Sequence, residues 1–217
     1  MTLELFPATD EPFRAPEPLG PGACVLRGFA LPFASELLAA LPRIEGVSPF
    51  RHLVTPGGYT MSVAMTNCGP LGWVSDRSGY RYDAIDPLSQ KPWPAMPAAF
   101  ARLAREAAET AGFAGFAPDA CLVNRYQPGT RLSLHQDRDE RDHGAPIVSV
   151  SLGMPAVFQF GGLARGDAVE RVPLAHGDVV VWGGPDRLRF HGVLPLKDKP
   201  HALLGSVRIN LTFRKAG

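Results

Sequence analysis

The chain has 217 residues, of which 45% are hydrophobic and 20% charged, and its formal net charge at pH 7 is +1. This composition is typical of one globular domain, excludes a disordered chain and provides no global positive field to attract nucleic acid. The three cysteines lie far apart in the sequence, which argues against a disulfide framework and predicts a reducing, cytoplasmic compartment.

The N-terminal half predicts few regular elements. Residues 1–22 contain five prolines and predict an irregular arm, without the basic and apolar segments of a signal peptide. Residues 23–29 predict a short strand, and residues 33–41 predict a helix that Pro42 ends. Residues 48–97 show little periodicity, with strand-like pieces at 59–65 and 79–82. A non-periodic stretch this long inside a compact domain is usually functional.

The C-terminal half predicts one helix followed by many strands. Residues 97–111 have an apolar stripe through Phe100, Leu103 and Ala107, and Gly112 predicts the end of this helix. Eight short strands follow, bounded by turn residues, at 120–126, 131–135, 146–152, 156–160, 170–174, 178–182, 188–194 and 205–214. This spacing predicts a β-sandwich or jelly roll, within a single domain over residues 1–217. No apolar run approaches the ~18 residues of a membrane span.

One histidine and one aspartate have the spacing of metal ligands. In the triplet His135-Gln136-Asp137, alternate residues of an extended segment point the same way. His191, 54 residues further on, can supply a third ligand, which gives the two-His, one-carboxylate site of Fe(II) oxygenases. The alternative is a hydrogen-bonded surface histidine. A second triplet, His176-Gly177-Asp178, opens a valine-rich strand and is interpreted as a turn.

The last predicted strand alternates regularly between polar and apolar residues. Arg208, Asn210, Thr212 and Arg214 share one face, with Ile209, Leu211 and Phe213 on the other face. An exposed antiparallel strand would account for this pattern. A pair of arginines on one face would also clamp a dicarboxylate such as 2-oxoglutarate, because a guanidinium binds carboxylate with two parallel hydrogen bonds.

Taken in this order, these residues resemble the AlkB family of Fe(II)/2-oxoglutarate-dependent dioxygenases. Further similar segments include Thr55-Pro-Gly-Gly-Tyr59, Asn124-Arg-Tyr126 and His176-Gly-Asp-Val-Val-Val-Trp-Gly-Gly184. The resemblance implies an α+β, mainly β fold, in which a double-stranded β-helix (jelly-roll) core over 118–214 follows N-terminal helices. It also implies a nucleotide-recognition lid over 48–97.

The resemblance also implies roles for individual residues. Iron would be held by His135, Asp137 and His191. The two carboxylates of 2-oxoglutarate would be bound by Asn124, Tyr126, Arg208, Asn210 and Arg214. A base flipped out of its helix would stack between Trp73 and His135. The other predicted substrate contacts are Tyr80, Arg81, Tyr82, Asp139 and Arg165.

The function that the resemblance implies is repair of alkylated DNA. Such an enzyme removes N-alkyl groups from bases such as 1-methyladenine and 3-methylcytosine in single-stranded or duplex DNA, or in RNA. It uses Fe(II), O₂ and 2-oxoglutarate and releases formaldehyde, succinate and CO₂. The alternatives are a 2-oxoglutarate-dependent hydroxylase of a protein or small molecule, and a non-catalytic nucleic-acid-binding module. We expect a monomer with no membrane association.

Overall fold

The computed structural model describes residues 15–217 of the chain, so residues 1–14 of the predicted arm lie outside the described residues. Residues 17–20, which were expected to be irregular, form strand β1 (Glu17–Gly20), because a tight turn pairs them with β2 (Ala23–Leu26). Within residues 15–217, no helix is long and apolar enough to cross a membrane.

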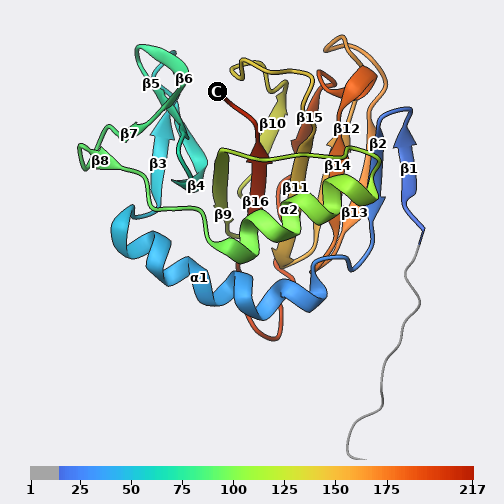
Figure 1. Cartoon of the computed structure of the whole chain (residues 1–217), viewed down its shortest axis with the longest axis horizontal. Coiled ribbons are helices and arrows are strands. Elements are labelled where there is room, and N and C mark those ends of the chain that lie inside the picture. Colours follow the sequence, from blue (N-terminus) through green and yellow to red (C-terminus); the bar gives the residue numbers. More distant parts are fainter. Residues whose placement is uncertain (1–14) are drawn as a thin grey trace, which may run out of the picture.

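A large sheet, whose strands differ in length, forms the centre of the molecule (Figure 1). Each of its neighbouring pairs is antiparallel. Its eight strands lie in the order β1, β2, β14 (Val179–Trp182), β11 (Ile147–Gly153), β16 (Arg208–Arg214), β9 (Ala120–Tyr126), β4 (Thr60–Cys68) and β3 (Arg51–Val54).

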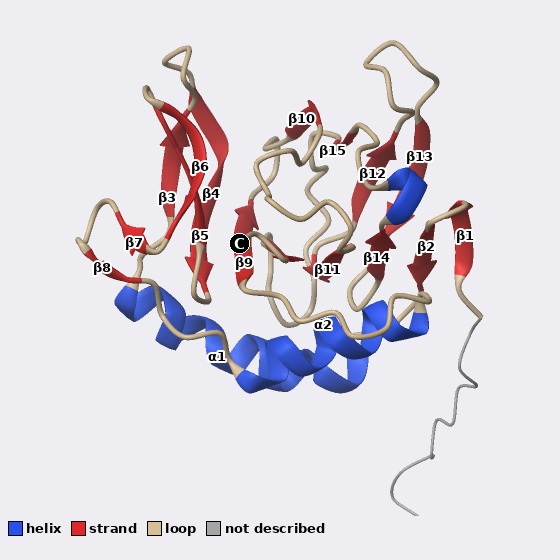
Figure 2. Ribbon diagram, turned by 45° about the horizontal axis from the view of Figure 1, so that its top comes forward, coloured by secondary structure: helices blue, strands red, loops and turns tan. Residues whose placement is uncertain are grey.

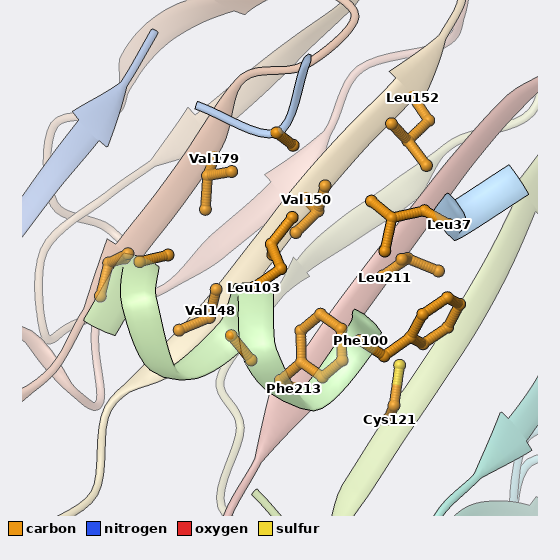
Figure 3. Packing of buried hydrophobic residues seen from close by; sticks show 14 of the residues in the cluster. Leu37, Phe100, Leu103, Cys121, Val148, Val150, Leu152, Val179, Leu211 and Phe213 are labelled. Carbon is orange, nitrogen blue, oxygen red and sulfur yellow. The ribbon is translucent and has the colours of Figure 1, made fainter. Parts of the chain in front are cut away.

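Two helices cover one face of this sheet (Figure 2). They are α1 (Ala34–Val47), which follows a 3₁₀ turn at Leu31–Phe33, and α2 (Ala98–Thr110). Their apolar side chains pack on Val148, Leu211 and Phe213 of the sheet (Figure 3). The prediction that Pro42 ends the first helix is wrong, because Pro42 lies inside α1 and the buried stripe continues to Ile44.

A smaller sheet packs against the other face. Its four strands lie in the order β10 (Leu132–His135), β15 (His191–Val193), β12 (Ala156–Phe160) and β13 (Glu170–Leu174), again antiparallel. A second apolar cluster, which includes Phe158, Phe160 and Trp182, fills the space between the two sheets. The mainly β jelly-roll architecture predicted from the sequence is therefore confirmed.

The segment 48–97 divides into two structural parts. Strands β3 and β4 extend the large sheet, because β4 pairs with β9. Two separate hairpins follow, β5 (Gly72–Asp76) with β6 (Gly79–Asp83), and β7 (Ile85–Asp86) with β8 (Lys91–Pro92). The second hairpin is anchored by a buried carboxylate, since Asp86 accepts hydrogen bonds from Arg51 and Ser48.

Candidate metal centre and substrate cavity

Two strands of the small sheet bring together the three predicted metal ligands. His135 ends β10 and lies opposite His191, the first residue of β15. Asp137 follows two residues after His135, and the ligand atoms of the three side chains all lie within 4.8 Å of one another. The strands approach so closely that a Cβ added to Gly192 would lie 2.7 Å from the carbonyl oxygen of Leu132.

Backbone carbonyls orient both histidine rings. The Nδ1 atom of His135 lies 2.9 Å from the Ser133 carbonyl oxygen, and that of His191 lies 3.1 Å from the Arg189 carbonyl oxygen. Because a carbonyl can only accept, each Nδ1 carries the proton. Each Nε2 therefore keeps its lone pair, which is the state in which imidazole binds a metal.

The charge of Asp137 is held by Arg214, on the polar face of β16. Arg214 donates from Nε (2.8 Å) and Nη2 (2.7 Å) to Oδ2 of the carboxylate. Burial raises the pKa of Asp137, but the charges of Arg214 and the two histidines outweigh burial and hold this pKa well below its ordinary value. Burial and the nearby His135 lower the pKa of His191 to about 3. At neutral pH Asp137 is thus a carboxylate and His191 a neutral imidazole.

Arg208 is a buried cation with unused hydrogen-bond donors. It is 1% exposed, donates from Nη2 to the hydroxyl of Ser151 (3.0 Å) and lies over the ring of Tyr126. Its Nε and Nη1 groups have no partner, and no carboxylate pairs with it within residues 15–217. Burial lowers its pKa. Since buried charges in proteins are normally paired, this site fits a carboxylate supplied by a ligand such as 2-oxoglutarate.

Amide and hydroxyl side chains connect the two arginines of β16. Asn210 donates to Ser149 Oγ (2.8 Å) and to the Val150 carbonyl (2.9 Å), so its Oδ1 is free to accept. This oxygen accepts from Thr212 (2.9 Å) and from Asn124 (3.2 Å). The predicted polar face of this strand is therefore buried, and the exposed-strand interpretation is wrong.

One cavity of about 1060 Å³ joins Arg208 and Arg214 to the metal ligands and to the protein surface. Besides Arg208, three of the arginines that line it form no ion pair within residues 15–217: Arg131, Arg138 and Arg165. All three are exposed, and Arg165 also donates to the Leu134 carbonyl (2.9 Å) and stacks on Phe190. Arg131 and Arg138 were not singled out from the sequence, although Arg138 stands between Asp137 and Asp139.

The hairpin β5–β6 supplies two of the aromatic residues that line the cavity. The rings of Trp73 and Tyr80 stack with centroids 5.6 Å apart, and Trp73 Nε1 donates to Asp139 (2.7 Å). All three residues line the cavity together with His135. The structure thus brings these predicted residues together, with Tyr80 as the aromatic neighbour of Trp73.

Two predicted substrate contacts do not line the cavity. Arg81 lies on the opposite side of the hairpin and pairs with Asp76 (2.9 Å). Tyr82 donates its hydroxyl to Glu140 (2.7 Å). Glu140 is buried and also contacts Arg214 (3.3 Å) and Arg187 (3.1 Å). Neither Glu140 nor Arg187 was singled out from the sequence, because isolated charged residues most often lie at the surface.

Comparison with known proteins gives a consistent result. Residues 22–214 match the family model of the 2OG-Fe(II) oxygenase superfamily. The chain is 61% identical over 214 residues to the alpha-ketoglutarate-dependent dioxygenase AlkB of Salmonella typhimurium, covering 99% of this chain and 98% of that protein. A shorter match, 42% over 109 residues (45% of this chain, 24% of the relative), is to the DNA N(6)-methyladenine demethylase ALKBH1C of Arabidopsis thaliana. The solved structure of OsALKBH1 superposes with a TM-score of 0.79 at 29% identity, covering 92% of this chain and 99% of that one.

Proposed function

Because this chain belongs to the AlkB family of the 2OG-Fe(II) oxygenase superfamily, we infer that it is an iron- and 2-oxoglutarate-dependent dioxygenase that demethylates N-alkylated bases in nucleic acid. The observation that carries the proposal is the buried guanidinium of Arg208, whose unpartnered donors lie on the cavity that also holds the three metal ligands. A buried cation beside a two-histidine, one-carboxylate site is the donor set that Fe(II) with 2-oxoglutarate needs.

Each part of the cavity has its own task in this reaction. When bound, Fe(II) and 2-oxoglutarate supply the O₂-derived oxidant that attacks the N-methyl group, which leaves as formaldehyde. His135, Asp137 and His191 hold the metal. Arg208 binds one carboxylate of the co-substrate, and Arg214 keeps Asp137 ionised. Asn124, Tyr126 and Asn210 complete the co-substrate end, and the buried walls exclude water.

The mouth of the cavity suits a nucleotide. Trp73, Tyr80 and His135 provide aromatic faces, on which base stacking contributes about 1–3 kcal/mol per base. The carboxylate of Asp139 favours a base that carries positive charge, as an N-alkylated base does. The three cavity arginines, which no carboxylate neutralises within residues 15–217, face the phosphates. In this proposal the hairpin β5–β6 is the lid of a single-domain, monomeric enzyme.

The decisive experiment incubates the protein with Fe(II), 2-oxoglutarate and short oligonucleotides that carry 1-methyladenine or 3-methylcytosine. Single-stranded DNA, duplex DNA and RNA are tested in parallel, and unmethylated strands serve as controls. Mass spectrometry should show loss of the methyl group, together with one succinate and one formaldehyde per repaired base. Equal succinate yields with methylated and unmethylated strands, without a change in strand mass, would instead favour a hydroxylase of a protein or small molecule.

A binding measurement tests the arginines separately. If three cavity arginines contact phosphates of a single strand, the logarithm of affinity should fall with the logarithm of salt concentration with a slope of about −2. Arg165→Ala should reduce this slope by about 0.7. Arg102→Ala is the matched control, because Arg102 also stacks on a phenylalanine but lies on the exposed side of α2.

A further inference from the structure

The segment that carries two of the three metal ligands, β10 and the residues that follow it, has little backbone pairing to hold it. Strand β10 has four residues and lies at the edge of the small sheet, with β15 as its only neighbour in that sheet. The pairing has two matched positions, Leu132 with Val193 and His135 with His191, and its register shifts between them. Asp137 lies beyond the end of this pairing. Backbone ladder bonds therefore do not fix the position of Asp137 relative to His191.

The side chain of Gln136, between the two ligands, compensates for the missing ladder. Consecutive residues of an extended chain point to opposite sides, so Gln136 points away from the metal ligands. Its Nε2 donates to the carbonyl of Leu188 and lies 3.4 Å from the carbonyl of Leu163. An amide nitrogen has two hydrogens, so both contacts can form at the same time.

The two carbonyls belong to the segments that complete the site. Leu188 comes three residues before His191, in the connection between β14 and β15. Leu163 lies in the connection between β12 and β13, two residues before Arg165. Loss of the amide would remove the bonds from Gln136 itself to both connections. Arg165 would still donate to the Leu134 carbonyl and Arg187 to the Asp137 carbonyl (3.0 Å), and the rings of His135 and His191 would keep their bonds to nearby carbonyls.

We propose that Gln136 is a positioning residue that sets the distance of His135 and Asp137 from His191, and thereby the affinity and geometry of the metal site. This inference rests on the metal site of the proposed function. Residues that orient metal ligands typically contribute 10- to 100-fold in metal affinity when removed. Methionine has nearly the length of glutamine but no donor, so Gln136→Met removes both hydrogen bonds without adding charge.

The test measures Co(II) binding to the full chain by the visible absorption of the bound ion, which reports ligand geometry. Gln136→Met should bind Co(II) about 10-fold more weakly than the wild type, with a shifted absorption band. Its metal-free melting temperature should equal that of the wild type. Gln127→Met, at an exposed turn residue outside the cavity, is the matched control and should change neither property.

The outcomes separate this inference from the proposed function. If the wild type binds no Co(II), the proposed metal site fails and this inference fails with it. Wild-type affinity and spectrum in Gln136→Met would overturn the role of Gln136 alone. A fall in the metal-free melting temperature that accounts for the weaker binding would also overturn it, because Gln136 would then hold the fold as a whole.

Discussion

Replacing Arg208 with methionine should make the ligand-free protein more stable and at the same time remove its response to 2-oxoglutarate. Two buried nitrogens of Arg208 lack a partner, and each unsatisfied group costs about 1–3 kcal/mol. The hydrogen bond that Arg208 donates to Ser151 stabilises the folded protein by about 1.5–3 kcal/mol, as is typical of a charged donor. Since methionine fills similar space without a charge, the free energy of unfolding should rise by about 2 kcal/mol.

A thermal melt separates the two effects: Arg208→Met should raise the melting temperature without ligand and abolish the further rise that 2-oxoglutarate causes. For a chain of this size about 1 kcal/mol corresponds to roughly 2–4 °C, so ligand-free Arg208→Met should melt about 4–8 °C above the wild type. With Mn(II) as a redox-inert ion and 2-oxoglutarate at 100 times its dissociation constant, the wild type should gain about 2.7 kcal/mol. The variant should gain nothing from 2-oxoglutarate.

Differential scanning calorimetry with and without 2-oxoglutarate measures both quantities. The reasoning fails if ligand-free Arg208→Met melts below the wild type, because Arg208 would then be a stabilising part of the core. It also fails if the variant retains the shift induced by 2-oxoglutarate, because the carboxylate would then bind elsewhere. Arg27→Met is a useful comparison, since Arg27 has carboxylate partners in Glu17 and Asp178 and its loss should lower the melting temperature.

Three further predictions concern the segment 48–97. Burial raises the pKa of Asp86, but hydrogen bonds from Arg51 and Leu88 bring it to about 2. Because this pKa is depressed in the folded protein, the free energy of unfolding should fall by about 1–2 kcal/mol as the pH falls from 4 to 2. Urea titrations should show a smaller loss in Asp86→Asn. A methyl group at Gly72 would overlap the indole of Trp93, so Gly72→Ala should lower the free energy of unfolding by about 1–3 kcal/mol, whereas Gly46→Ala, in open space on α1, should not lower it. Tyr82→Phe loses its bond to buried Glu140 and should cost about 1.5–3 kcal/mol in chemical denaturation; a change below 0.5 kcal/mol, the size typical of a surface substitution, would contradict this.

Two of the three metal ligands could be predicted from the sequence because their geometry is local. His135 and Asp137 are two residues apart on an extended segment, and this spacing alone places both side chains on one side. The same alternation predicted the shared face of Arg208 and Arg214. That this face is buried could not be predicted from the strand itself, because its burial depends on the small sheet that packs over it.

The sequence-based expectations fail where contacts between residues far apart in the sequence determine the structure. The helix expected to end at Pro42 continues because Ile44 is buried against the sheet. Arg81 and Tyr82 were grouped with Tyr80 as one contact surface, but only Tyr80 lines the cavity. Arg81 is the neighbour of Tyr80 in the strand and faces the opposite side, whereas Tyr82 shares the side of Tyr80 but bonds to buried Glu140. The pairing of Glu140 with Arg187 joins residues 47 positions apart, and no local pattern indicates it.

Gly192 has a consequence for how this protein can diverge. Every substitution of glycine adds a Cβ, and at this position a Cβ would collide with the backbone of β10. Mutation of Gly192 therefore cannot change the distance between the two histidines in small steps. The exposed cavity residues Tyr80, Arg131 and Arg138 meet no such constraint. Evolution can thus change which molecules enter the cavity while the chemistry at its base stays the same.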